Sequence, residues 1–137
     1  MVHGRTITVS TTGFSDIVNI SVEVQSAVSA SGITDGLVAV TVIGSTASVT
    51  TIEYEPALVE DMKEWLEKII PRTIRSRHSE TWGDDNGFSH MRASLMGPGI
   101  TLPVVNGRVL TGTWQQIVVV DHDNRPRQRD VRIQVTG

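Results

Sequence analysis

Histidine, aspartate and asparagine side chains are concentrated in one polar segment in the middle of the sequence, residues 77–90. The segment contains His78 and His90, two of the four histidines, together with Asp85 and Asn86. These side chains are groups that bind metal ions or transfer protons in proteins. The segment has neither a strand-like nor a helical apolar period, which predicts a loop. Its Asp-Asp-Asn-Gly composition is also typical of an ordinary turn, so a functional site and a plain loop are both open.

The two histidines could bind one divalent metal ion, Mg²⁺ or Zn²⁺, because neutral imidazole is a common nitrogen ligand of zinc-like metals. A catalytic zinc site uses three protein ligands and one open position, and the residues do not identify the third ligand here. Without a metal, His78 and His90 would be hydrogen-bonded pocket residues, with His78 as a proton donor or phosphate contact. Asp85 and Asn86 could bind Mg²⁺ or orient a histidine through its second ring nitrogen.

Basic and hydroxyl side chains near this segment could contact a phosphate group. Arg72, Arg75 and Arg77 precede the polar segment and could neutralise the charge of a leaving diphosphate, or form a solvated face. Ser45 and Thr46 lie in a run of small residues, which lets a ligand approach the backbone closely. That run matches neither a Walker loop nor a dinucleotide-binding fingerprint. A tight turn into a buried strand explains it equally well.

Three further polar or aromatic positions are candidates, each with a structural alternative. Glu53 is expected at a strand end, as a functional carboxylate or an exposed cap. Gln115 is expected to point either into the pocket or away from it. Trp82 could stack on a pyrimidine ring or cover a contact between subunits. Trp65 and Trp114 are expected in the core, with the indole N–H of Trp114 hydrogen-bonded.

The composition indicates one folded domain spanning residues 1–137. Hydrophobic residues make up 39% and charged residues 20%, which is typical of a folded protein and excludes a disordered chain. The net charge of −3 argues against a nucleic-acid binder that relies on a basic face. Cysteine is absent, which excludes a disulfide framework and a cysteine nucleophile. No signal peptide or membrane span is expected, so the cytoplasm is the expected compartment.

The apolar patterns predict an α+β domain with a mostly antiparallel β-sheet and two helices. The surest helix covers 56–70, because its apolar residues recur at spacings of three and four behind a proline. A second helix is expected at 21–31, ending at a glycine. A hairpin turn is expected at 121–126. The expected strands cover residues 5–11, 37–43, 47–53, 90–96, 107–110, 114–120 and 130–136.

Several polar signatures follow one another along nearly the whole chain. In order they are the segment 44–55, Asp61, His78, Asp85-Asn86, His90, and the block 94–115, which ends in Gly112-Thr113-Trp114-Gln115. This series resembles the YjbQ family, also called UPF0047, whose members are often labelled secondary thiamine-phosphate synthase. The combination of His…Asn…His with Gly-Thr-Trp-Gln is specific to that family.

The resemblance implies a compact domain that forms a homotrimer, with a polar pocket near the subunit boundaries. It also implies condensation of hydroxymethylpyrimidine diphosphate with thiazole phosphate and release of pyrophosphate, as a side activity of a metal-assisted enzyme. The implied catalytic residues are His78, Glu53, Asp85 and Asn86. The implied substrate-binding residues are Ser45, Thr46, Arg77, Trp82 and Gln115. His78 and His90 are the implied metal ligands.

One departure from the family affects the metal. Many members carry a histidine where this chain has Gly44, so a third ligand would have to be Glu53, Asp61 or water, or the metal is absent. Two other functions therefore stay open. One is a trimeric metal- or small-molecule-binding protein without catalysis. The other is a purely structural trimer. The expected partners are further copies of the chain and a small phosphorylated substrate, with no nucleic acid and no membrane.

Overall fold

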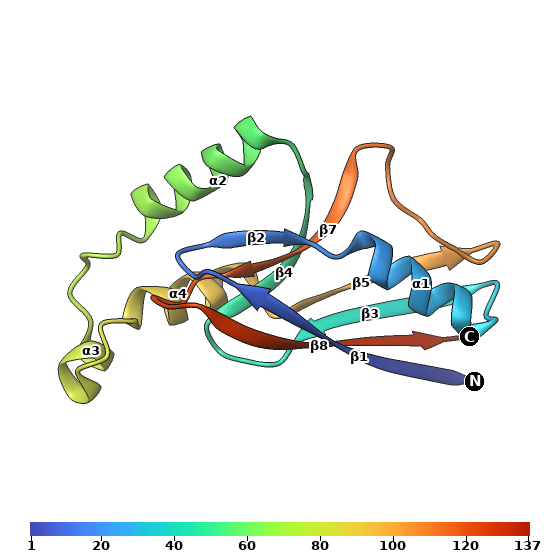
Figure 1. Ribbon diagram of the computed structural model, residues 1–137, viewed down its shortest axis with the longest axis horizontal. Helices are drawn as coiled ribbons and strands as arrows, with labels where there is room; N and C mark the ends of the chain where they lie inside the picture. Colours follow the sequence, from blue (N-terminus) through green and yellow to red (C-terminus); the bar gives the residue numbers. More distant parts are fainter.

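The computed structural model describes all residues, 1–137, and consists of two antiparallel sheets and four helices (Figure 1). The larger sheet has the strand order β1-β8-β3-β5-β6, and the smaller sheet has the order β2-β7-β4. The elements are β1 (Val2–Thr11), β2 (Asp16–Asn19), α1 (Ser21–Ser31), β3 (Gly36–Val42), β4 (Ala47–Glu53), α2 (Pro56–Ile69), α3 (Arg77–Trp82), α4 (Gly87–Met96), β5 (Gly99–Val105), β6 (Arg108–Val109), β7 (Gln115–Asp121) and β8 (Arg127–Thr136).

The main core lies between the two sheets and under α1. Its cluster of 17 buried residues is mostly valine and isoleucine, consistent with a chain that has few aromatic residues. In β8, Val131, Ile133 and Val135 are buried, while the residues between them are exposed or half-buried. Successive side chains of a strand point to opposite faces, so β8 has one face in the core. The α+β class with antiparallel sheets is thus confirmed.

A second, smaller cluster lies on the other face of the small sheet. Ile17, Ile52, Val118 and Val120 are buried there, against partly buried side chains of α2. Because both faces of β7 are covered, the residues from Ile117 to Asp121 are all buried and do not alternate. None of the four helices is long and apolar enough to cross a membrane.

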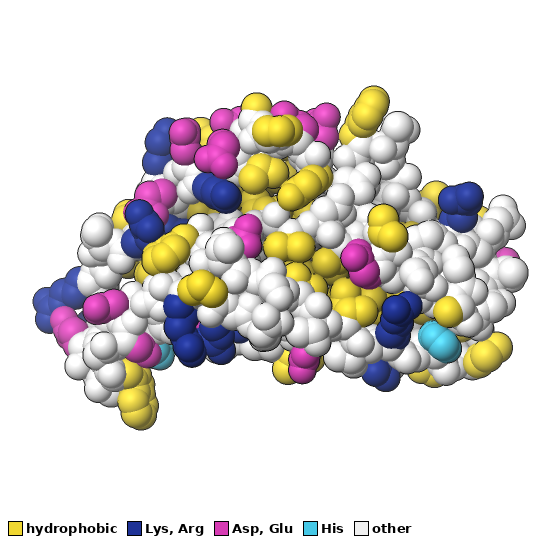
Figure 2. Space-filling model, in the orientation of Figure 1, with side chains coloured by type: hydrophobic (Ala, Val, Ile, Leu, Met, Phe, Trp, Pro, Cys, Tyr) yellow, Lys and Arg dark blue, Asp and Glu magenta, His cyan; other side chains and the backbone are white.

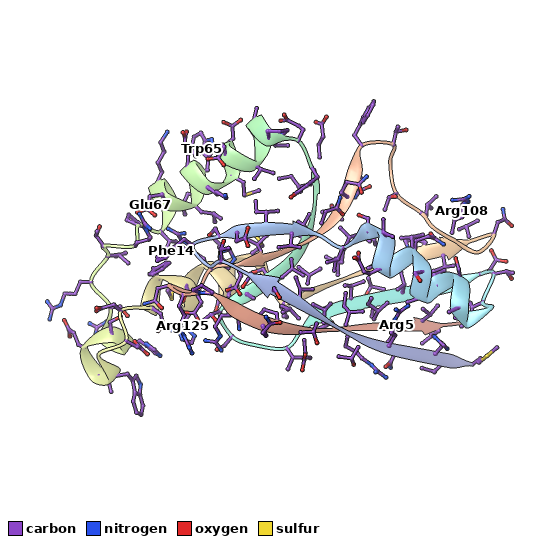
Figure 3. The ribbon with its side chains drawn as sticks, in the orientation of Figure 1. Arg5, Phe14, Trp65, Glu67, Arg108 and Arg125 are labelled. Atoms are coloured by element: carbon purple, nitrogen blue, oxygen red, sulfur yellow. The ribbon has the colours of Figure 1, made fainter.

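The helix α2 packs less deeply than its apolar stripe predicts. Leu66 is its one fully buried residue, and Trp65 and Ile69 are each 58% exposed. The prediction that Trp65 belongs to the core is wrong, because the three-stranded sheet under α2 covers only part of the helix surface. Figure 3 shows Trp65 on the side of α2 that faces away from the sheets.

Both predicted helices are confirmed, and their ends have the expected local chemistry. The helix α1 ends before Gly32, whose φ of 70° is the left-handed conformation common after a helix. In α2, the Glu55 carboxylate accepts hydrogen bonds from the N–H groups of Ala57 and Leu58, and Pro56 occupies the first turn. The predicted strand 47–53 is confirmed residue for residue as β4.

The predicted strand 90–96 is wrong, since these residues belong to α4. The buried residues of α4 include Phe88, Ser89, Arg92 and Ala93, which is a helical spacing. The pattern was hidden because a buried arginine occupies a position where an apolar residue is expected. The predicted loop also contains the short helix α3, which Ser76 caps and Gly83 ends. Four helices are therefore present where two were expected.

The predicted hairpin at 121–126 is also wrong. The strand before it, β7, pairs with β2 and β4, whereas the strand after it, β8, pairs with β1 and β3. The segment therefore passes from one sheet to the other. The strands β2 and β5 were not predicted, because β2 has only four residues and β5 contains Pro103.

Candidate functional site

The structure brings His78 and His90 into contact. Their ring centroids lie 4.4 Å apart, with 44° between the ring planes. His78 comes from the first turn of α3 and His90 from the first turn of α4. The two helices approach closely at Gly87, where a Cβ atom would lie 1.9 Å from the Ser76 hydroxyl oxygen. Only glycine fits this position, so the close approach that joins the histidines is built into the sequence.

Charged groups around the pair give the two imidazoles different surroundings. His78 Nδ1 lies 3.2 Å from the Asp84 carboxylate, but it is buried and has no aligned hydrogen-bond partner. Burial and the neighbouring His78 lower the pKa of His90, against the opposing influence of Asp123 and Asp84. His90 is therefore a neutral imidazole at pH 7, which is the form that accepts a proton or binds a metal.

Asn86 joins the histidine pair to the buried ends of the strands. Its side-chain amide donates a hydrogen bond of 3.3 Å to Asp123 Oδ1, while its own Oδ1 is buried without a partner. Asp123 Oδ2 accepts from the Thr46 hydroxyl at 3.0 Å and from Arg127 at 2.7 Å. Although burial favours a neutral carboxyl, hydrogen bonds from Asn124, Asn86 and Thr46 lower the pKa of Asp123. Asp123 is thus an anion behind the site.

Thr46 has a structural role here. Its hydroxyl donates to Asp123 and accepts from Arg129 at 2.6 Å, so it is fully engaged. Arg129 in turn donates to both carboxylate oxygens of Asp121, at 2.7 and 2.8 Å, in a buried two-point ion pair. Ser45, by contrast, is exposed at the surface. Of the two hydroxyl residues predicted to bind substrate, Ser45 is the one that a ligand can reach.

A groove of about 580 Å³ runs beside the histidine pair, along α3. Its lining includes Arg72, Arg75 and Asp85, and Asp85 has a left-handed φ of 54°. Figure 2 shows both basic and acidic side chains at the end of the molecule that carries α3, and mostly acidic side chains along α2. The groove therefore presents two arginines and two carboxylates, Glu80 and Asp85, along the helix that also carries His78. The lining residues are Arg72, Thr73, Ile74, Arg75, Ser76, Ser79, Glu80, Asp85 and Phe88.

Near this groove, two stacked aromatic rings lie between two arginines. The Arg72 guanidinium lies 4.9 Å from the ring centroid of Phe14, and Arg92 lies at the same distance from that of Phe88. The two rings are nearly parallel, with centroids 6.5 Å apart. Each arginine is thereby attracted to a ring face, which fixes its position.

Two predicted site residues lie at the opposite end of the small sheet. Glu53 is paired with Gln115, while Ala47 at the other end of the same strand is paired with Asp121 beside the histidine site. Six residue steps along a strand correspond to about 20 Å. One copy of the chain therefore does not bring Glu53 or Gln115 to His78.

The remaining predicted aromatic and basic residues are exposed. Trp82 is 72% exposed at the end of α3, and Arg77 lies at the start of that helix. Trp114 is 73% exposed, so its expected place in the core is wrong. It precedes β7 in an outer loop, where no second layer of structure covers it.

His78 and His90 would give a metal two ligands, whereas a catalytic metal site needs three. No group of three or more His, Cys, Asp or Glu side chains lies close enough together to hold a metal ion. Asp61, a candidate third ligand, is exposed on α2. Gly44 has a φ of 153°, and a Cβ there would lie 2.8 Å from Arg129 Nη1, so a histidine would require a rearrangement. The residues of a single chain do not fit a complete metal site.

Sequence reasoning missed the central role of the segment Asp121-His122-Asp123. All three residues are buried, and His122 accepts or donates hydrogen bonds at both ring nitrogens, to Ser15 at 2.8 Å and to Ser48 at 3.1 Å. Arg92 donates to the Ser15 hydroxyl at 3.1 Å. Ser15 therefore donates its own proton to His122 Nδ1, which leaves the proton of His122 on Nε2. In the sequence, Asp121 and Asp123 on either side of His122 could have indicated a site, but the same composition is typical of an exposed turn.

Comparisons with known proteins place the chain in a family. The family described as "UPF0047 protein YjbQ-like" matches residues 5–137. A UPF0047 protein of Methanothermobacter thermautotrophicus is 34% identical over 89% of this chain and 83% of its own length. The UPF0047 protein YugU of Bacillus subtilis is 30% identical over 97% of this chain and 98% of its own.

Solved structures show the same fold. A protein of Sulfolobus solfataricus P2, described as YbjQ-like and of unknown function, superposes with a TM-score of 0.94 and 30% identity. It covers 100% of this chain and 98% of its own. A YjbQ/UPF0047 protein of Clostridium acetobutylicum gives a TM-score of 0.88 at 30% identity, over 96% of this chain and 99% of its own. By sequence and by fold, the chain belongs to the YjbQ-like UPF0047 family.

Proposed function

We propose that the site around His78 and His90 binds and transforms a small phosphorylated molecule, with thiamine-phosphate synthesis as a side activity. In that reaction a ring nitrogen of thiazole phosphate attacks the methylene carbon of hydroxymethylpyrimidine diphosphate. The bond from that carbon to the diphosphate oxygen breaks, and the electron pair leaves with pyrophosphate. The proposed compartment, that of such phosphorylated metabolites, is the cytoplasm.

One observation carries the proposal. The two buried polar side-chain atoms that lack a hydrogen-bond partner are His78 Nδ1 and Asn86 Oδ1, and both belong to this site. Buried polar atoms in folded proteins are almost always hydrogen-bonded, so two exceptions at one place point to a missing binding partner. One is a ring nitrogen and the other a carbonyl oxygen, which suits a ligand that carries both donors and acceptors, such as an aminopyrimidine.

The surrounding charges support a diphosphate leaving group. Arg72 and Arg75 line the neighbouring groove, each beside a glutamate, and would turn toward departing pyrophosphate to stabilise its negative charge. His90, held neutral by burial and by His78, would accept a hydrogen bond from the amino group of the pyrimidine and so orient it. His78, whose Nδ1 lies 3.2 Å from the Asp84 carboxylate, would donate a hydrogen bond from its other ring nitrogen to the departing pyrophosphate.

The proposal also includes a divalent metal ion and a homotrimer, with the metal bound between two copies of the chain. Mg²⁺ or Zn²⁺ would be held by His78 and His90 with a third ligand from a second copy of the chain, since one copy supplies no set of three. The proposed homotrimer would supply that copy. Glu53 and Trp114, far from His78 in one chain, are the residues that a neighbouring copy would contribute.

A binding protein without catalysis is the second candidate. The unpartnered His78 Nδ1 and Asn86 Oδ1 call for a ligand but not for turnover. Binding without product formation would favour this function.

The test is thiamine-phosphate formation from the two substrates with Mg²⁺ or Zn²⁺, followed by thiochrome fluorescence. We expect His78→Ala and His90→Ala each to lower the rate by about 100-fold or more, because a positioned hydrogen-bonding group at the reacting centre contributes this much. His3→Ala is the matched control. His3 lies on β1 of the five-stranded sheet, paired with Val135, and belongs to neither α3 nor α4. If folded and assembled wild-type protein, supplied with metal, forms no product, the synthase activity is refuted. A normal rate in both variants would refute the site.

A further inference from the structure

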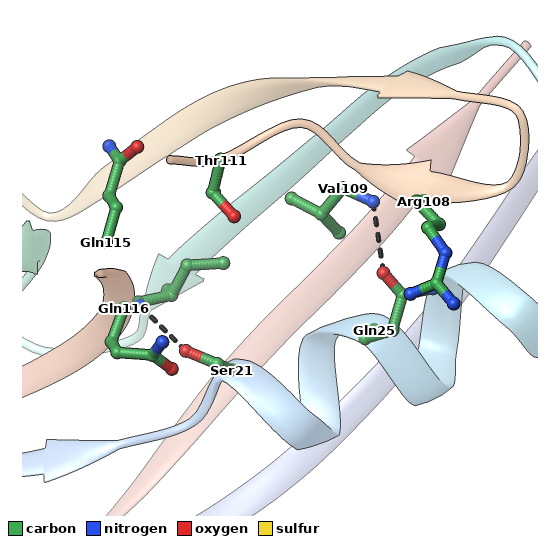
Figure 4. Close-up of a pocket in the computed structure, with 8 residues that line it drawn as sticks. Ser21, Gln25, Arg108, Val109, Thr111, Gln115 and Gln116 are labelled. Atoms are coloured by element: carbon green, nitrogen blue, oxygen red, sulfur yellow. Dashed lines mark hydrogen bonds between the residues drawn. The ribbon is translucent and has the colours of Figure 1, made fainter. Parts of the chain in front are cut away.

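A second cavity, distant from the histidine pair, presents hydrogen-bond donors and almost no free acceptors. It has a volume of about 190 Å³ and lies between α1, β6 and the start of β7 (Figure 4). Figure 3 shows Arg108, which lines it, at the opposite end of the molecule from Arg125 beside α4. Its lining contains no aspartate or glutamate and consists of Ser21, Gln25, Arg108, Val109, Thr111, Gln115, Gln116 and Ile117.

The three glutamines of the cavity have their carbonyl oxygens occupied by the protein. Gln25 Oε1 accepts from the Val109 N–H at 3.0 Å, and Gln115 Oε1 accepts from the Gly112 N–H at 3.0 Å. Gln116 Oε1 accepts from the Asn19 side-chain amide at 3.3 Å. The orientation of Asn19 is fixed because its oxygen accepts from the Ser21 N–H. The Gln116 oxygen must therefore face Asn19, and its NH₂ group is left without a protein partner.

The other polar groups of the cavity are donors too. The Arg108 guanidinium makes no hydrogen bond or ion pair with the rest of the chain, although its backbone pairs with Val105, and the Thr111 hydroxyl makes no hydrogen bond. The Ser21 hydroxyl oxygen accepts from the Ile117 N–H at 2.8 Å, and its O–H is free to donate (Figure 4). One guanidinium, one amide NH₂ and two hydroxyls are thus available, with one positive charge and no negative charge.

We infer that this cavity is a binding site for the phosphate group of a small molecule, separate from the histidine site. A phosphate has three oxygens, which accept several hydrogen bonds at once, and arginine binds it through two parallel N–H groups. A carboxylate has only two oxygens and would leave donors of the cavity unpaired. The cavity volume accommodates a phosphate with a short substituent.

The test is a titration of ¹⁵N-labelled full-length protein with inorganic phosphate at constant ionic strength. We expect a saturable shift of the Gln116 side-chain NH₂ signals, with a dissociation constant on the order of 1 mM for so small a ligand. Arg108→Gln should weaken binding by about tenfold or more, because it removes a charge-assisted pair. Arg108 makes no contact that the fold needs, so this variant should retain the wild-type spectrum elsewhere. Arg125→Gln, at the other end of the molecule, is the control.

Two further arms separate the alternatives. In His90→Ala the Gln116 shift should persist, so the phosphate site can stand even if the proposed transferase activity fails. Acetate in place of phosphate should bind at least tenfold more weakly. The inference is overturned if Gln116 does not shift, if Arg108→Gln shifts with the same midpoint, if acetate binds equally well, or if phosphate perturbs only the groove around Arg75.

Discussion

Acidification should destabilise the fold through His122 at a pH where the carboxylates are still ionised. Burial and the nearby Arg92 lower the pKa of His122 from 6.5 to about 4. A histidine whose pKa is lower in the folded state binds its proton more readily when unfolded. The stability from neutral His122 is therefore fully present above pH 6.5, and it is lost as the pH falls from 6.5 to about 4.

The size of this effect follows from the shift. One pKa unit corresponds to about 1.4 kcal/mol, so lowering the pH from 7 to 4.5 should remove about 2–3 kcal/mol of unfolding free energy. Asp121 and Asp123, whose pKa values are also lowered, lose their contribution only below their unfolded pKa of 3.8. The two acid effects therefore fall in different pH windows.

The assay is urea unfolding at one fixed protein concentration, with wild-type protein and His122→Gln compared from pH 7 to pH 4.5. Glutamine can still donate to Ser48 but cannot titrate. It should cost about 1–3 kcal/mol at pH 7, because the Ser15 hydroxyl loses its acceptor. Since His90 contributes equally to both proteins, the gap between the two curves isolates His122. A gap that stays constant from pH 7 to pH 4.5 would refute the reasoning.

Two further predictions concern stability. Arg92 is 2% exposed and donates to Glu67, Ser15 and the Ile70 carbonyl, so Arg92→Met should cost about 3–5 kcal/mol in urea unfolding. Arg75→Met, at an exposed ion pair, should change stability by less than about 0.5 kcal/mol. If Arg92→Met and Arg75→Met cost the same, the hydrogen bonds of Arg92 do not stabilise the fold. Leu66→Ala should cost about 2–5 kcal/mol and Trp114→Ala much less, and a large loss for Trp114 would mean that assembly buries it.

Local patterns of apolar residues, with proline and glycine at the ends of the helices, made most of the strands and both long helices predictable. The strand 47–53 has Ala, Val and Ile positions that fit a buried strand, and Pro56 with the spacing of Leu58 to Ile69 fits one helix. The helix α4 could not be recognised, because Arg92 occupies its buried face. The carboxylate of Glu67 in α2 and the carbonyl of Ile70, the residue after that helix, make the burial favourable, and no local pattern contains this information.

Only part of the site, residues whose types suggest chemistry, could be predicted from the sequence. His78, His90 and Asn86 could be selected from their residue types, and the fold brings them together. Asp123 and His122 could not, because an acidic segment with Asn124 and Pro126 reads as an exposed turn. It becomes buried only because the chain crosses there from β7 in one sheet to β8 in the other.

The most direct test of the proposed site is the proton titration of His90, followed by ¹H–¹⁵N NMR with and without hydroxymethylpyrimidine diphosphate. In the free protein, the pKa of His90 should lie below 6.5, because burial and His78 disfavour its charged form. Bound diphosphate beside the ring should raise that pKa, and the His122 signals should stay unchanged. If the diphosphate leaves the titration of His90 unaltered at saturating concentration, the ligand does not bind at the His78–His90 site and the proposed function is wrong.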